Sequence, residues 1–164
     1  MANDILNLDL SATKGTVIHV NGDPDAQIVL NLSDFGIYNR LKEGLTQLYD
    51  VFVELKDKMG EKAQAEDPED DDDSGTPKFI EAMQESDAKM RGIIDYIFSS
   101  PVSEVCAPNG YMFDIFEGQL RFEYIINAIT ELYESNINKE FYNIKSRINS
   151  KLPQYAKAEK KKGQ

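Results

Sequence analysis

The sequence predicts an α+β protein that is mainly α, with an N-terminal β-hairpin packed on about three main helices. Three observations support this prediction. Two short, β-branched segments flank an Asn-Gly turn, stretches with apolar residues at every third or fourth position follow, and an acidic run separates two of these stretches. The length of 164 residues suits one domain, or two small lobes joined by a linker.

The hairpin is predicted from Thr16 to Val20 and from Ala26 to Leu30. Between these strands lies the turn Asn21-Gly22-Asp23-Pro24. Asn and Gly adopt the positive φ angles that a tight hairpin turn requires, and Pro favours an extended exit. A single hairpin is marginally stable alone, so we expect it to pack on a helix or another strand.

A first helix is predicted after the N-cap candidate Ser33-Asp34. Its apolar stripe consists of Ile37, Leu41, Leu45, Leu48, Phe52, Leu55 and Met59. Gly60 is the expected stop. Residues 1–59 therefore form the predicted N-terminal region of hairpin plus helix.

Residues 60–77 are predicted to be a flexible acidic linker. Seven of the eight residues from Glu66 to Asp73 are acidic, and no large apolar side chain interrupts them. Like charges at this density repel one another, and the segment cannot bury enough apolar surface to offset its ordering entropy.

Residues 78–152 are predicted to be a helical region that contains an aromatic loop. One helix runs from Thr76-Pro77 to Pro101, and another from Arg121 to Ser150. The irregular segment 102–118 between them is so apolar that we expect it to tuck under the helices. Leu152-Pro153 is the expected break, after which 153–164 form a basic, disordered tail.

The predicted core combines the apolar faces of these helices. Its members are Leu41, Leu45, Leu48, Phe52, Ile94, Ile97, Phe98, Phe122, Ile126, Ile129, Leu132 and Phe141.

Composition excludes several classes of function. The formal net charge of −11 repels phosphate backbones, so we expect no nucleic-acid partner. No apolar run approaches the roughly 18 residues of a membrane span, and the N-terminus lacks the pattern of a secretory signal. A single cysteine, Cys106, excludes an internal disulfide framework and indicates a reducing compartment, the cytoplasm.

Candidate catalytic and metal sites each have a simpler explanation. Asp70, Asp72, Ser74, Gly75 and Glu81 resemble the spacing of a calcium-binding loop, but Pro77 and Lys78 interrupt the pattern. A solvated acidic linker therefore explains these residues better.

Cys106 would need a nearby base to act as a nucleophile, and the one histidine, His19, lies in a predicted strand of the other half. Pairs such as Asp114 and Glu117, or Glu117 and Glu123, suit solvated carboxylates better than acid–base work. We expect no catalytic residue, no metal ligand and no cofactor, and thus no enzyme.

Aromatic residues exceed what one helix face needs for a core. A small protein with surplus aromatic surface often binds a partner helix or self-associates. The predicted partner-binding residues are Tyr111, Phe113, Phe116, Tyr133 and Tyr142.

The order of these features resembles a known family. The hairpin, the acidic linker, the loop VSEVCAPNGYMFD and the helix FEYIINAITELYESNINKEF are similar to tail assembly chaperones of tailed phages and prophages of Gram-positive bacteria. The resemblance covers most of the chain except the linker and the tail, and its most specific part is the SEVCAP loop with the helix that follows.

The resemblance implies a binding function. Proteins of that family keep the long, helical tape-measure protein soluble during tail morphogenesis, in the cytoplasm of the infected or lysogenic host, and are absent from the mature virion. Two alternatives stay open: a minor virion structural protein of the tail or the head–tail joint, and a small acidic phage effector that binds a host protein. The tape-measure protein, or another long helical phage protein, is the expected partner.

Overall fold

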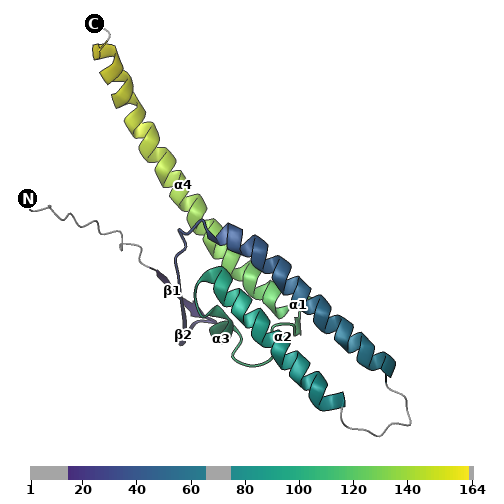
Figure 1. The fold of residues 1–164 in the computed structure, drawn as a ribbon. Helices are drawn as coiled ribbons and strands as arrows, with labels where there is room; N and C mark the ends of the chain where they lie inside the picture. Colours follow the sequence, from purple (N-terminus) through teal and green to yellow (C-terminus); the bar gives the residue numbers. More distant parts are fainter. Residues whose placement is uncertain (1–14, 66–74, 163–164) are drawn as a thin grey trace, which may run out of the picture. The chain divides into compact units, whose positions relative to one another are not determined.

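The computed structural model describes the backbone of residues 15–65 and 75–162. The burial of side chains is described for residues 15–60 and 78–150. Its elements are β1 (Thr16–Val20), β2 (Asp23–Leu30), α1 (Ile37–Ala65), α2 (Gly75–Phe98), α3 (Val102–Cys106), β3 (Ile115–Phe116), β4 (Gln119–Leu120) and α4 (Arg121–Lys162) (Figure 1). The described chain is mainly helical with an N-terminal antiparallel hairpin, which confirms the predicted fold class.

The N-terminal hairpin turns at Asn21-Gly22, the first half of the predicted turn, and β2 begins at Asp23 where we expected Ala26. Asn21 and Gly22 have positive φ angles, 55° and 72°, which match the right-handed twist of the flanking strands. β1 and β2 pair in antiparallel register from Thr16 with Leu30 onwards, and the register shifts near the turn. β2 buries Ile28 and Leu30 and contacts the short helix α3, which the sequence did not predict.

Asp34 starts α1 and connects it to the end of α2. One carboxylate oxygen of Asp34 accepts a hydrogen bond from the backbone N–H of Gly36 at 2.8 Å, and the other pairs with Arg40 at 2.6 Å. Arg40 also donates from Nε to the carbonyl of Ile97 at 2.9 Å. That carbonyl belongs to the last turn of α2, where carbonyls lack intrahelical donors. Arg40 therefore joins two helix ends.

α1 and α2 run antiparallel and pack along each other (Figure 1). Gly44 lies at a close approach between them. A Cβ atom built there would stand 2.4 Å from two side-chain atoms of Ile97, which is fully buried. Gly92 of α2 is different, because a Cβ atom there would meet nothing within 4 Å. One glycine is thus required by packing and the other is not.

α2 ends in a Schellman motif whose left-handed residue is Ser99, with a φ of 50°. The N–H of Ser99 donates to the carbonyl of Tyr96 at 3.3 Å, and the N–H of Ser100 donates to the carbonyl of Asp95 at 3.2 Å. Two of the last carbonyls of α2 are satisfied in this way. Pro101 then leads directly into α3.

The core consists of side chains with less than a tenth of their surface exposed. Its apolar members are Ile28, Leu30, Ile37, Leu48, Leu55, Met90, Ile94, Ile97, Phe98, Val102, Ala107, Met112, Phe122, Ile125, Ile126, Ile129, Tyr133 and Ile137. Of the predicted core, Leu41, Leu45 and Phe52 are half-buried. Leu132 and Phe141 were wrongly predicted, because they are 38% and 52% exposed. The buried face of α4 passes through Tyr133 instead of Leu132.

Three predicted helix boundaries are wrong. Residues 60–65 continue α1 and 75–77 begin α2, so only 66–74 of the expected linker lie outside the described residues. An isolated glycine such as Gly60 costs a helix about 1 kcal/mol, too little to end α1 by itself. α4 likewise continues beyond Pro153 to Lys162, where we expected a disordered tail, since proline can bend a helix without ending it.

The segment 102–118, expected to be irregular, contains α3 and the strand β3. The chain also divides into two compact units, and the boundary falls inside α4 between Ile126 and Asn127. We refer to residues 1–126 as the N-terminal unit and to 127–164 as the C-terminal unit.

The two α-helical glycines give a matched test of α1–α2 packing. We expect Gly44→Ala to destabilise the protein by about 1–3 kcal/mol, because the new methyl group overpacks against Ile97. Gly92→Ala should stabilise it by about 0.5–1 kcal/mol through helix propensity alone. Urea denaturation measures both. Equal effects of the two substitutions would contradict the packing assigned to Gly44.

The ion pair of Asp34 predicts a pH dependence of stability. The hydrogen bond from Arg40 is the main reason why the pKa of Asp34 lies below its ordinary value of 3.8, with burial opposing it. Because the folded pKa is the lower one, this carboxylate contributes stability above pH 3.8 that is lost as pH falls through the folded pKa.

We therefore expect Asp34→Asn to lower the Tm at about pH 6 and to have a smaller effect at about pH 3. Asp57→Asn, at an exposed position of α1, is the control. A difference between wild type and Asp34→Asn that is the same at both pH values would show that the charge of Asp34 does not contribute.

Candidate binding surface

The aromatic loop, residues 107–120, connects α3 to α4 and contains two local turns. Asn109-Gly110 forms the first, where Gly110 has a φ of 84°. Glu117-Gly118 forms the second, with φ angles of 48° and 78°. These angles are those of a two-residue hairpin turn, and they bring Ile115 opposite Leu120. The loop therefore ends in a small β-hairpin.

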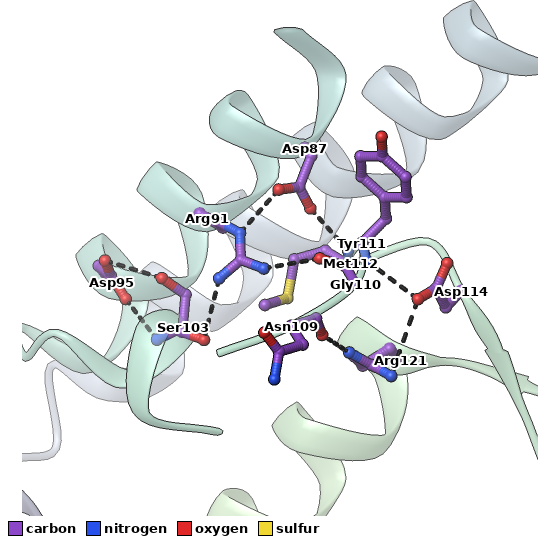
Figure 2. Close-up of polar contacts among 10 residues, drawn as sticks. All are labelled: Asp87, Arg91, Asp95, Ser103, Asn109, Gly110, Tyr111, Met112, Asp114 and Arg121. Atoms are coloured by element: carbon purple, nitrogen blue, oxygen red, sulfur yellow. Dashed lines mark hydrogen bonds and ion pairs between the residues drawn. The ribbon is translucent and has the colours of Figure 1, made fainter. Parts of the chain in front are cut away.

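Arg91 of α2 holds the loop in place. Its Nε donates to the carboxylate of Asp87 at 2.7 Å, and its two terminal nitrogens donate to the carbonyls of Ser103 and Gly110 at 3.2 and 3.0 Å (Figure 2). One guanidinium group thus joins α2, α3 and the loop. Its side chain is 22% exposed and that of Asp87 is 14% exposed, so the pair is largely shielded from water.

Two carboxylates of α2 accept backbone N–H groups from the same segment. Asp87 accepts the N–H of Met112 at 2.7 Å, and Met112 is fully buried. Asp95 accepts both the N–H and the hydroxyl of Ser103, at 2.8 and 3.1 Å. Charge-assisted bonds of this kind are stronger than neutral ones. The polar row Asp87, Arg91 and Asp95 therefore fixes both α3 and the start of the loop (Figure 2).

The first residues of α4 are bonded to the same loop. The N–H of Arg121 donates to the carbonyl of Asp114 at 2.7 Å, and the N–H of Phe122 donates to the carbonyl of Met112 at 2.9 Å. Asp114 also accepts the N–H of Tyr111 at 3.0 Å, and the Arg121 side chain reaches Asp114 and the carbonyl of Asn109 (Figure 2). Two of the N–H groups that a helix start leaves unpaired are satisfied here by the loop.

These contacts present an apolar surface at the small hairpin. Ile115 is 78% exposed, and Phe116 and Tyr124 are each 48% exposed. The rings of Phe116 and Tyr124 pack edge to face, with centroids 5.4 Å apart. We name Ile115, Phe116 and Tyr124 the hairpin surface. A large aliphatic side chain held this far into solvent gains nothing from the fold itself, which makes it a candidate for binding.

The five predicted partner-binding residues do not form one surface. Tyr111 and Phe113 are half-buried in the loop and stack at 4.9 Å, and Phe116 belongs to the hairpin surface. Tyr133 is 1% exposed, so the expectation that it lies on the surface was wrong. Tyr142 is 73% exposed but belongs to the C-terminal unit.

Ile115 is exposed, whereas an apolar residue of the segment 102–118 was expected to tuck under the helices. The local signal for the small hairpin is Gly118 after Glu117, which is weaker than the Asn-Gly of the first hairpin, and the flanking strands have only two residues each.

A shallow groove of about 540 Å³ lies between α1 and α2. It is lined by Gln47, Asp50, Val51, Lys89, Gly92, Ile93 and Tyr96. Its walls are mostly apolar, and Tyr96 is 54% exposed. We call this hollow the α1–α2 groove.

The candidate chemical residues lie apart from these surfaces. Burial, and secondarily the negative charge of Asp95, raises the pKa of the Cys106 thiol, so the thiol form is favoured at neutral pH. His19 is exposed in β1 beside Gln27. Within residues 15–65 and 75–162, no group of three or more His, Cys, Asp or Glu side chains is placed to hold a metal ion. Of the calcium-like pattern, positions 70–74 lie outside the described residues.

No family model, curated protein or solved structure matches this chain. In the part of the chain that the structure describes, none of the helices has the length and apolar character needed to cross a bilayer.

Arg91 is the residue whose loss should detach the loop. We expect Arg91→Met to destabilise the protein by about 2–3 kcal/mol, because Asp87 loses its ion pair and the carbonyls of Ser103 and Gly110 lose their bonds to the guanidinium group. The amide of Met112 should also exchange faster with solvent. Lys58→Met removes an exposed ion pair with Glu54 and should change stability by less than about 0.5 kcal/mol. Urea denaturation and amide hydrogen exchange measure these effects. Wild-type protection of Met112 in Arg91→Met would contradict the assigned role.

Proposed function

We propose that this protein is a phage tail assembly chaperone that binds and solubilises the tape-measure protein during tail morphogenesis. The observation that supports this best is the hairpin surface, where Ile115 is 78% exposed on a loop held by Arg91 and Asp87. A fixed apolar surface of this kind suits a partner that offers an apolar stripe of its own.

The chemistry of the hairpin surface suits an amphipathic helix. Ile115 supplies an aliphatic contact, and the Phe116–Tyr124 pair supplies a flat aromatic one. Helix-in-groove recognition uses residues at i, i+3, i+4 and i+7 of the bound helix, and such contacts are mostly apolar. A long helical protein repeats this pattern many times, so several copies of the chaperone could cover one partner.

The charge of the chain supports the same proposal. A formal net charge of −11 on each bound copy would make a coated partner strongly negative. Mutual repulsion between coated partners opposes their aggregation. The proposal places this activity in the cytoplasm of an infected or lysogenic bacterial host, and it expects the protein to be absent from mature particles.

The proposal predicts that charge on the hairpin surface abolishes binding. We expect Ile115→Asp with Phe116→Asp to leave the fold intact, because both side chains are exposed, while the tape-measure protein becomes insoluble. The assay is co-expression with the long helical protein encoded downstream, followed by affinity purification and light scattering of the soluble fraction. Wild type should give a complex with many copies of this chain per partner.

Ile80→Asp is the matched control, because Ile80 is an apolar residue of α2 that is 44% exposed outside the hairpin surface. It should solubilise the partner as wild type does.

If the double variant keeps its stability and still forms the complex, the hairpin surface is not the binding site. If wild type elutes free and the partner aggregates, the chaperone function is wrong. Recovery of the chain from purified particles would then favour the virion protein, and co-purification with a host protein the effector.

A further inference from the structure

The C-terminal unit carries an apolar helix face that continues from buried to exposed residues. Ile129, Tyr133 and Ile137 of α4 are at most 6% exposed and follow one another at intervals of four. The same face continues as Phe141, Ile144 and Ile148, which are 52%, 38% and 53% exposed. We name these last three residues the exposed stripe.

The exposed stripe lies in a segment of α4 whose residues are solvent-exposed on every face of the helix. Every residue from 138 to 150 is exposed. Most of the stability of helices in proteins comes from burial of an apolar face, and the apolar face of this segment stays largely open to solvent. A partner that covers the exposed stripe would extend the burial that ends at Ile137.

Charge indicates what that partner is. The C-terminal unit has eight Lys and Arg against four Asp and Glu, a formal charge of +4, whereas the N-terminal unit has 10 against 25, a formal charge of −15. Without the acidic run of residues 66–73, the N-terminal unit would still have 18 acidic residues against 10 basic ones. Lys145 and Arg147 lie within the exposed segment itself. The segment therefore suits an acidic protein surface, and every copy of this chain carries one.

The N-terminal unit offers a receptor for such a helix in the α1–α2 groove. Val51, Ile93 and Tyr96 give it apolar walls, and Gly92 leaves open space for a close approach. Asp50 lines the groove, and Glu54 and Asp57 follow it at i+4 and i+7 on the same face of α1. Lys89 is the basic residue of the lining. Lys58 pairs with Glu54 on this face, which leaves three carboxylates against one lysine there. An apolar hollow beside a helix face with this acidic excess complements an apolar stripe beside Lys145 and Arg147.

We propose that the exposed stripe of one copy docks in the α1–α2 groove of a second copy, so that the chain associates with itself through basic and acidic surfaces. Anionic membranes and nucleic acids would attract the basic segment, but they would repel the N-terminal unit with its charge of −15. Direct pairing of two C-terminal segments would bring like charges together. This proposal does not depend on the proposed chaperone function.

The full-length protein tests the proposal by sedimentation equilibrium at several concentrations. We expect association at about 50 mM NaCl that weakens at about 500 mM, because salt screens attraction between opposite charges. Phe141→Asp with Ile148→Asp should raise the dissociation constant by about tenfold or more. Tyr142→Asp with Asn138→Asp is the control, since it adds the same charge at exposed positions of the segment outside the stripe.

The groove is tested by Gly92→Lys, which adds bulk and positive charge where a Cβ atom meets nothing within 4 Å. Gly60→Lys is the matched control, because Gly60 is also helical and equally open but does not line the groove. Gly92→Lys should weaken association, and Gly60→Lys should not. Circular dichroism checks that each variant remains folded.

Mixing the two defective variants gives the sharpest test. The stripe variant keeps an intact groove, and Gly92→Lys keeps an intact stripe, so the mixture should form a one-to-one complex that neither variant forms alone. Failure of this complementation, or a wild-type monomer at all concentrations, would overturn the proposal. Association that strengthens with salt would instead indicate pairing of two C-terminal segments. Binding of wild type to phosphatidylserine vesicles without self-association would indicate a membrane, and would likewise overturn it.

Discussion

The organisation of the N-terminal unit depends on the hydrogen bonds that the guanidinium group of Arg91 donates. It is bonded to a carboxylate of its own helix and to carbonyls 12 and 19 residues further along the chain. Those carbonyls belong to α3 and to the aromatic loop, two segments too short to be stable in isolation. Because a planar guanidinium group has donors in fixed directions, it positions both segments at once, which an ammonium group would not do.

The loop in turn completes the start of α4. The carbonyls of Met112 and Asp114 accept the N–H groups of Phe122 and Arg121, respectively. These two bonds fix the position of the first turn of α4 relative to the loop. Phe122 is fully buried, packs edge to face on Tyr49 of α1 and brings the first turn of α4 to that helix. The polar contacts are therefore continuous from α2 through the loop to α4. Ile115 lies between loop residues that these bonds hold in place, and its own side chain is exposed.

The sequence predicted the fold where the signal is local. Asn21-Gly22 identified the first hairpin, and periodic apolar residues identified α1, α2 and α4. It failed where several weak signals compete: Gly60 and Pro153 did not end their helices, and the four-residue strand pairing around Glu117-Gly118 was too short to recognise. Aromatic content identified Phe116 but misplaced Tyr133, because spacing alone does not determine how wide the buried face of a helix is.

The polar row of α2 could not have been predicted as a site. Asp87 and Arg91 are four residues apart, a spacing that normally indicates an exposed ion pair on a helix. Their other partners, Met112 and Gly110, lie 25 and 19 residues away and bond through the backbone, which leaves no trace in residue type. The hairpin surface depends on this row, and it was therefore only partly predictable.

Gly44 has a consequence for the axial alignment of α1 and α2. The backbone at Gly44 is a notch that accommodates Ile97, and the neighbours one turn away on the same face are Arg40 and Leu48. Sliding α2 by one helical turn, about 5.4 Å, would place Ile97 against a long side chain instead. Gly44 therefore favours the observed axial alignment of the two helices. The glycine thus helps to set the register of α1 against α2 from within the helices themselves.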